Sequence, residues 1–243
     1  MSFVLVAVSK HMNNRMSTIK ENTERLLREL PLGVQLVVAG KDRIVEELMA
    51  VIEGDARIIG ENYVQETEAV HVTIGNTVQW HFIGHLQKNK VKRAVELFDM
   101  IETVDSLELA KELDKRCSLI RKIMPVLIEL NSAREQNKTG VLPENVLALV
   151  REIATLPHIR LMGLMTMGAT SINPEEYRPY FALTKRLFDE ISRLNLPNVE
   201  MKYLSMGMTD SYRVAVQEGA NLVRIGTGIF GTQRSKVKSQ NHR

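Results

Sequence analysis

Short apolar runs alternate with amphipathic stretches along most of this chain of 243 residues. Residues 34–39 (VQLVVA) form a short run rich in β-branched residues, and apolar side chains recur at helical spacing over residues 42–52. Further strands are predicted over residues 57–59, 78–83, 100–103, 125–130, 159–166, 199–205 and 221–225. Strands that alternate with helices form a parallel sheet. Eight such units in this length predict a single α/β domain, a (β/α)8 (TIM) barrel, with an open doubly wound sheet as the alternative.

Two segments at the ends of the chain fall outside this alternation. A further strand-like run, Phe3–Val8, precedes a helix that is expected to begin at Ser17. We therefore assign residues 1–16 to an N-terminal extension, either an edge strand or a disordered leader, and residues 17–233 to the barrel with its extra N-terminal helix. Residues 234–243 contain four basic residues and no acid, enough to account for the whole net charge of +3. This composition predicts a solvated, disordered tail, and the rest of the chain shows no nucleic-acid-binding face.

Cysteine usage and the absence of long apolar runs indicate the compartment. The chain has one cysteine, Cys117, which cannot form an internal disulfide and falls on the apolar face of a predicted helix. A buried core thiol is therefore expected rather than a nucleophile. No apolar run approaches the roughly 20 residues of a membrane span, and the first residues lack the basic region and cleavage site of a secretory signal. These features favour a cytoplasmic protein with no membrane association.

The loop after the eighth predicted strand carries the clearest signal for binding. In a barrel of this kind, functional side chains lie at the carboxyl ends of the strands. Gly226-Thr227-Gly228 follows the eighth strand, where main-chain N–H groups and the threonine hydroxyl can hold an oxyanion. Ser205 and Gly207 supply the neighbouring loop, and barrels often bind phosphate at these two loops. We therefore expect a phosphate site here; the alternative is a turn in which glycine only relieves steric crowding.

Two basic residues lie next to this turn in the predicted barrel. Lys41 directly follows the first strand and points either to solvent or to the barrel mouth. Beside a phosphate site it suits a Schiff base with an aldehyde cofactor. Arg224 lies two residues before the turn and would be costly to bury without an acceptor; its alternative role is a salt bridge with a barrel carboxylate such as Glu129. Asn62 and His81 also lie at strand ends, where isolated polar residues are more often structural than catalytic.

Five segments together resemble one known family. They are residues 60–66 (GENYVQE), 80–90 (WHFIGHLQKNK), 163–166 (GLMT), 204–208 (LSMGM) and 223–231 (VRIGTGIFG). In this order and spacing they are similar to the pyridoxal phosphate homeostasis protein family, over about residues 17–231. The resemblance implies a single barrel like the N-terminal domain of alanine racemase, with pyridoxal 5′-phosphate (PLP) as cofactor. It also implies a role in vitamin B6 homeostasis and no robust catalytic activity.

The resemblance implies that a lysine at the end of the first strand binds PLP, and two lysines compete for that role. Residues 4–10 (VLVAVSK), which end in Lys10, look more like the family's sequence before its lysine, whereas Lys41 follows a glycine. Spacing favours Lys41, which lies 19 residues before Gly60 with one predicted helix between them. Lys10 lies 50 residues before Gly60, with two helices and a strand between. We therefore predict that Lys41 forms the Schiff base, and the Lys10 segment stays unexplained.

The other cofactor-binding positions are implied residue by residue. The implied set is Lys41, Asn62, His81, Ser205, Met206, Arg224, Gly226 and Thr227, with no catalytic residue and no metal. Arg224 would face the pyridine nitrogen, and Asn62 and His81 would lie near the ring. Met206 would add a main-chain N–H to a phosphate site formed by the loops after strands seven and eight. Because a cation at the ring nitrogen disfavours its protonation, the ring is a poorer electron sink and transaminase chemistry is not expected.

Three functions stay open on this basis. The first is a non-catalytic, monomeric PLP-binding protein that buffers the cofactor or delivers it to apo PLP enzymes. The second is a PLP-dependent amino-acid racemase, which needs an acid–base group on each face of the cofactor. In alanine racemase a second domain supplies one of these groups, and here the barrel uses almost the whole chain, which favours the first function. The third is a phosphate-binding barrel enzyme without PLP, with Lys41 as general base, and it predicts a colourless protein.

Overall fold

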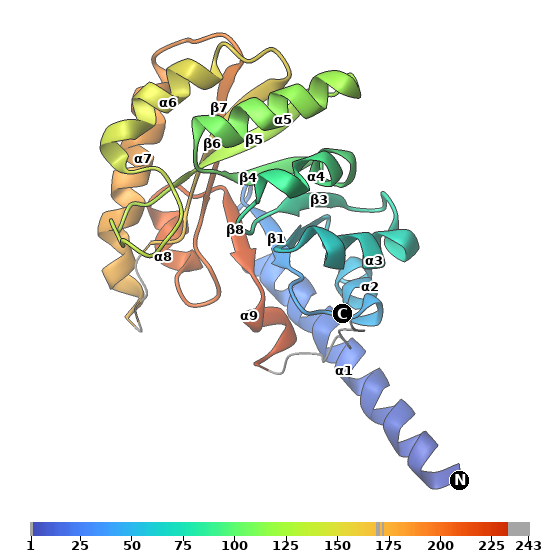
Figure 1. Cartoon of the computed structure of the whole chain (residues 1–243). Helices are drawn as coiled ribbons and strands as arrows, with labels where there is room; N and C mark the ends of the chain where they lie inside the picture. Colours follow the sequence, from blue (N-terminus) through green and yellow to red (C-terminus); the bar gives the residue numbers. More distant parts are fainter. Residues whose placement is uncertain (1, 169–170, 172, 233–243) are drawn as a thin grey trace.

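Eight parallel strands form a closed barrel (Figure 1). The computed structural model describes residues 2–168, 171 and 173–232, with side chains from Met12 onward. The strands are β1 (Gln35–Ala39), β2 (Ile58–Glu61), β3 (Gln79–Phe82), β4 (Met100–Val104), β5 (Met124–Leu130), β6 (Ile159–Thr166), β7 (Val199–Met206) and β8 (Leu222–Ile225). Each strand pairs with the next, and β1 closes the ring against β8, where Val37 lies opposite Arg224. The predicted (β/α)8 barrel is confirmed, and the open doubly wound sheet is wrong.

Helices alternate with the strands and surround the barrel (Figure 1). They are α1 (Ser2–Glu29), α2 (Val45–Glu53), α3 (Val64–Ile74), α4 (Val91–Leu97), α5 (Leu107–Leu119), α6 (Val146–Ile153), α7 (Arg178–Ser192), α8 (Tyr212–Gln217) and α9 (Thr227–Phe230), with 3-10 turns η1 (Lys88–Lys90), η2 (Pro143–Asn145) and η3 (Pro174–Tyr177). Helix α6 illustrates why these segments are helical and pack on the strands. Its apolar residues Val146, Val150 and Ile153 recur at helical spacing and are buried. Pro143 begins the turn that leads into this helix, because the first helical turn needs no proline N–H.

Two apolar layers hold the barrel together. Side chains alternate along each strand, so Val37 and Ile58 belong to a small cluster inside the barrel. Their neighbours Val38 and Ile59 belong to the larger core between the strands and the helices. Cys117 of α5 is fully buried in this outer core, and burial raises the pKa of its thiol to about 11. The prediction of a buried core thiol is therefore confirmed.

Most of the predicted N-terminal extension belongs to one continuous helix. Because α1 runs without a break from Ser2 to Glu29, the Phe3–Val8 run is helical and Ser17 lies inside the helix. The edge strand, the disordered leader and the helix start at Ser17 are therefore wrong, although the extra N-terminal helix is present. A closed barrel offers no edge with which a ninth strand can pair. Ile19 and Leu26 anchor the second half of α1 in the outer core, and the first half projects away from the barrel (Figure 1).

The predicted basic tail, residues 234–243, lies outside the described residues. The division of the chain into extension, barrel and tail stays a prediction. Within the described part of the chain, no helix is both long enough and apolar enough to cross a membrane.

Gly163 allows β6 to pass its neighbour β7 at a register shift. Its φ is 148°, and an added Cβ would overlap the carbonyl oxygen of Tyr203. Gly163→Ala is therefore expected to lower the free energy of unfolding by about 2–3 kcal/mol, because strain and overlap combine. Denaturant unfolding measures this loss beside Gly33→Ala, where φ is also positive but an added Cβ meets nothing within 4 Å. The control should lose only about 1 kcal/mol, and equal losses would contradict the steric argument.

Candidate functional site

All eight predicted binding residues lie near or just after the carboxyl ends of strands, so they come together at one end of the barrel. They are Lys41 after β1, Asn62 after β2, His81 on β3, Ser205 and Met206 at the end of β7, Arg224 on β8, and Gly226 and Thr227 after β8. Parallel strands in a closed barrel present all these ends on the same side. The barrel mouth is therefore the candidate site.

A chain of hydrogen bonds crosses the barrel interior below this mouth. The Nδ1 atom of His81 pairs with Glu102 Oε1 at 2.6 Å, and Ser205 Oγ donates to Glu102 Oε2 at 2.6 Å. Arg224 donates to Ser205 Oγ at 2.6 Å and to the main-chain carbonyl oxygen of Thr166 at 2.9 Å. Every one of these side chains is buried. The guanidinium of Arg224 is thus held in one orientation by two different strands.

Glu102 and Arg224 form a charge pair that is bridged by a hydroxyl. Burial alone would raise the pKa of Glu102, but His81, Arg224 and Ser205 together hold it below its ordinary value. Burial lowers the pKa of Arg224, and the charges of Glu102 and Glu129 oppose that shift. Since an arginine keeps its proton far above neutral pH, the pair is charged on both sides. The fully buried carboxylate is the counter-charge that lets an arginine lie inside the barrel.

The sequence analysis named the wrong acidic partner for Arg224, Glu129, and did not predict Glu102. The predicted alternative, a salt bridge between Arg224 and Glu129, is not what the structure has, because Arg224 donates to Ser205 and Thr166 instead. Glu129 accepts from the Thr139 hydroxyl, which lies 3.1 Å from both carboxyl oxygens. Glu102 was not predicted at all. Its signal was present in the sequence, since it is the one charged residue in the buried strand MIETV.

Lys41 and Lys10 occupy very different places. Lys41 comes directly after β1, and its Nζ lies 5.2 Å from the centre of the Tyr63 ring at the start of α3. It also acts on Glu66 of α3, whose pKa burial raises and the Lys41 charge lowers. Lys10 lies in α1, in the half of the helix that projects from the barrel (Figure 1). The structure therefore brings Lys41, not Lys10, to the barrel mouth, and its role as the reactive lysine stays a prediction.

The glycine turn after β8 packs closely against its neighbours. An added Cβ at Gly226 would lie 3.3 Å from the Cβ of Ala39, at the end of β1. The hydroxyl of Thr227 donates to Thr209 Oγ1 at 2.9 Å, and the N–H of Gly228 donates to the same oxygen at 3.1 Å. Thr209 therefore joins the loops after β7 and β8, a contact that the sequence analysis did not foresee. The close packing supports the steric alternative for Gly226, and the binding of a phosphate by this turn stays a prediction.

Comparisons with known proteins identify the family. The model of the family described as "Alanine racemase, N-terminal domain" matches residues 15–234. A pyridoxal phosphate homeostasis protein of Haemophilus influenzae is 36% identical over 211 residues, which cover 86% of this chain and 88% of that protein. Another, from Aquifex aeolicus, is 36% identical over 224 residues, which cover 90% and 97%. The chain belongs to the pyridoxal phosphate homeostasis protein family. The family resemblance of the five sequence segments is thereby confirmed.

Solved structures of similar proteins agree with the fold. PipY of Synechococcus elongatus with PLP bound is 30% identical, with a TM-score of 0.81 over 88% of this chain and 100% of that chain. PipY without PLP is 31% identical, with a TM-score of 0.83 over the same shares of 88% and 100%. An alanine racemase of Clostridium difficile is 16% identical, with a TM-score of 0.71 over 93% of this chain and 57% of that chain. The predicted likeness to the N-terminal domain of alanine racemase is confirmed at the level of fold.

Two of the predicted phosphate ligands of this family member have side chains that are engaged elsewhere. Ser205 has one hydroxyl proton, and it donates that proton to Glu102 while its oxygen accepts from Arg224. In this arrangement its hydroxyl has no further proton to donate, and its place in the phosphate site stays a prediction. The side chain of Met206 is buried in the outer core, so that only its main chain is left for the site, as predicted. Ser205 acts on the site through Arg224.

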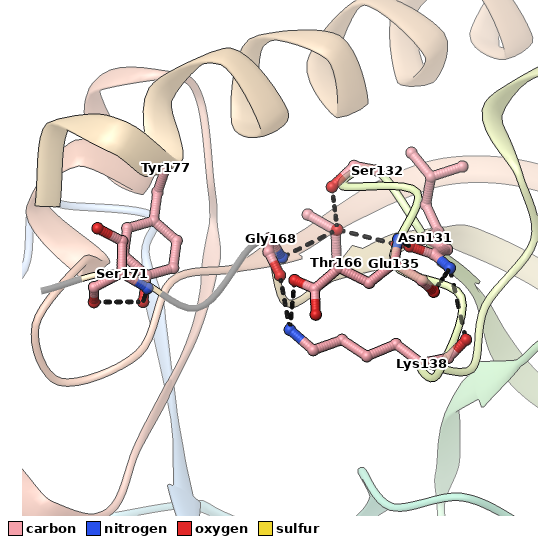
Figure 2. A network of polar contacts seen from close by, with 9 residues as sticks. Asn131, Ser132, Glu135, Lys138, Thr166, Gly168, Ser171 and Tyr177 are labelled. Atoms are coloured by element: carbon pink, nitrogen blue, oxygen red, sulfur yellow. Dashed lines mark hydrogen bonds and ion pairs between the residues drawn. The ribbon is translucent and has the colours of Figure 1, made fainter. Parts of the chain in front are cut away.

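A cavity of about 340 Å³ lies across the mouth from the glycine turn. Its lining includes Asn62, Ile83, His85, Glu129, Asn131, Lys138 and Met165. Figure 2 shows how the loops after β5 and β6 meet at its edge: the Ser132 and Thr166 hydroxyls are 2.8 Å apart, and Lys138 Nζ donates to the carbonyl oxygen of Gly168 at 3.4 Å. Thr166 thus has a fixed position, and its carbonyl oxygen is the one that holds Arg224.

Glu61, at the end of β2, makes the stability of this family member depend on pH. Burial raises the pKa of its carboxyl from 4.5 to about 8, and the like charges of Glu66 and Asp42 add to the shift. The folded protein keeps this proton up to about pH 8, whereas the unfolded chain releases it near pH 4.5. Between these values the unfolded state binds fewer protons, so Glu61 lowers the stability as pH rises.

Glu61→Gln is therefore expected to be more stable than the parent protein above about pH 8 and to lose this part of the pH dependence. Denaturant unfolding at a series of pH values checks the prediction. Below pH 4.5 the two proteins should differ little, because neither state of the parent is ionised at this position. Parallel stability curves for the two proteins over the whole range would contradict it.

Proposed function

We propose that the protein binds PLP at the barrel mouth and acts in PLP (vitamin B6) homeostasis as a non-catalytic binding protein. The observation that carries the proposal is PipY, which has been solved with PLP bound and is 30% identical over 88% of this chain. The relatives from Haemophilus influenzae and Aquifex aeolicus, named pyridoxal phosphate homeostasis proteins, support the role. Lys41, Arg224 and the 226–228 turn meet at the same end of the barrel, which supports the site.

The residues at the mouth fit this cofactor. PLP supplies an aldehyde that reacts with amines and a ring that withdraws electrons. Lys41 offers a primary amine directly after β1. The turn at Gly226 lets the main chain approach an anionic phosphate without a side chain in the way, and Thr227 would add its hydroxyl by giving up the hydrogen bond to Thr209. Asn62, which lines the neighbouring cavity, is placed to contact the ring.

Arg224 is the residue that restrains the chemistry. The Ser205 hydroxyl and the Thr166 carbonyl oxygen hold its guanidinium inside the barrel, where Glu102 keeps it paired. A fixed cation that faces the pyridine nitrogen would disfavour a proton on that nitrogen. The ring would then stabilise a carbanion weakly, which favours plain binding over transamination. His81 supports the same cation through Glu102.

An amino-acid racemase is the second candidate. Racemisation by two bases needs acid–base groups on opposite faces of the cofactor, and the likeness to alanine racemase covers 57% of that enzyme's chain. Exchange of the α-proton in deuterated solvent, for a panel of amino acids, separates the two functions. Rapid exchange with turnover would overturn a non-catalytic role. A phosphate-binding enzyme that lacks PLP is the third candidate and predicts a colourless protein after incubation with the cofactor.

The proposed function implies recipient proteins for PLP and a cellular location. We expect a monomer that passes PLP to apo PLP enzymes. A cytoplasmic location is supported by the single cysteine, whose buried thiol is free. Transfer is measurable by mixing the PLP-loaded protein with an apo enzyme and recording the recovery of that enzyme's activity.

Borohydride reduction tests the site directly. The protein is loaded with PLP, reduced and digested, and the modified peptide is mapped by mass spectrometry. A pyridoxyl group on Lys41 is the expected result. The same group on Lys10 would keep the function and overturn the site, whereas no modification and no colour would favour the phosphate-binding enzyme.

A further inference from the structure

Glu61 is a buried acid beside the proposed cofactor site that has no role in the binding described above. Its residue is 2% exposed, and its Oε2 atom is buried without a hydrogen-bond partner among the described residues. On β2, Gly60 packs against Val37 inside the barrel, so the next side chain, Glu61, points to the outside of the sheet. Burying a carboxyl oxygen without a hydrogen bond lowers the stability of the fold, so this side chain calls for a structural or functional reason.

The carboxyl of Glu61 occupies the space of a missing side chain. An added Cβ at Gly40 would overlap Glu61 Oε1 and would lie 3.1 Å from Cγ2 of Ile59. Gly40 is the residue directly before Lys41, and its N–H donates to the Gly60 carbonyl oxygen at 2.9 Å. The same residue begins the turn that carries Lys41, because the N–H of Arg43 donates to its carbonyl oxygen at 3.0 Å. Glu61 therefore packs against the main chain on which Lys41 depends.

We propose that Glu61 is a positioning residue for Lys41: its carboxyl fills the space beside Gly40 and holds the Gly40–Lys41 turn in place. The inference rests on the proposed PLP-binding function. Ionisation would place a charge in this apolar space, where Glu66 of α3 and Asp42 of the same turn carry the same sign and Lys41 carries the opposite one. Burial makes this ionisation costly, so the charged carboxylate is driven toward water and the turn loses its support.

The test follows PLP binding by visible absorbance across a series of pH values, with far-UV circular dichroism as a check that the protein stays folded. The parent protein is expected to lose affinity as pH rises through about 8. Glu61→Gln keeps the shape but cannot ionise, so this loss should be absent, while affinity at lower pH stays within about twofold of the parent. A role confined to folding would change unfolding curves but would leave this pH profile unmoved.

Two further variants distinguish the inference from its alternatives. Glu66→Gln removes a like charge, so the pH of the transition should move downward while Glu61 stays in place. Gly40→Ala puts a methyl group into the space of the carboxyl and should weaken PLP binding at every pH. Identical pH profiles for the parent and Glu61→Gln, with Lys41 labelled in both after borohydride reduction, would overturn the positioning role alone. An absence of label on Lys41 in the parent would overturn the proposed function first.

Discussion

Replacing Glu102 with alanine should lower the free energy of unfolding by about 3–5 kcal/mol, because the change leaves a buried arginine without its counter-charge. Glu102 is fully buried and links two branches of the network, His81 on one side and Ser205 with Arg224 on the other. Its removal leaves His81 and Ser205 each without the carboxylate oxygen to which they are hydrogen-bonded. The lost carboxylate lies on the buried inward side of β4, so the guanidinium keeps its desolvation cost with only the weaker effect of the Glu129 charge to oppose it.

Denaturant unfolding at neutral pH measures this loss, with Glu152→Gln as the matched control. Glu152 lies exposed on α6, and its replacement should change stability by no more than about 0.5 kcal/mol. A loss below about 1 kcal/mol for Glu102→Ala would contradict the view that the carboxylate holds Arg224 inside the barrel. Glu102→Gln is expected to fall between the two, since it keeps the volume and a hydrogen-bond acceptor but not the charge.

The barrel was predictable because its local and global signals agree. Runs such as residues 34–39 are apolar on both faces, as a strand covered by helices must be, and every predicted strand lies within two residues of an observed one. The prediction for the N-terminal run was wrong because its local and global signals disagree. Phe3–Val8 has the composition of a strand, but the closed barrel offers no edge, and the segment continues the helix that follows it.

The candidate site was predictable as a set of positions but not as a set of hydrogen bonds. Strand ends meet at the mouth of any such barrel, so Lys41, Arg224 and the 226–228 turn could be placed together from the sequence. The sequence does not show that the Ser205 hydroxyl is committed to Glu102 and Arg224. That commitment depends on which inward residues of β4, β7 and β8 lie at the same height, a property of register and not of any single motif.

Replacing Lys41 with alanine is expected to abolish both the Schiff-base absorbance of the PLP-loaded protein and the pyridoxyl label left by borohydride. The fold should persist, because Lys41 lies in a half-buried turn and contributes to stability through the exposed Tyr63 ring, a contact of about 0.5–1 kcal/mol. Lys10→Ala, at the rival position on α1, should keep the colour and the label in full. A label that survives in Lys41→Ala and disappears in Lys10→Ala would reverse the assignment.

Lys41→Arg separates the amine of this residue from its charge. Arginine keeps a cation beside Tyr63 and Glu66 but has no amine that reacts with an aldehyde. If the glycine turn and Arg224 hold the cofactor by themselves, Lys41→Arg should still bind PLP reversibly, which equilibrium dialysis measures, while borohydride leaves no label. Loss of reversible binding as well would mean that the covalent bond supplies most of the affinity. A delivery protein needs the first arrangement, because a cofactor held mainly by main-chain N–H groups and one fixed cation can leave when an amine displaces Lys41.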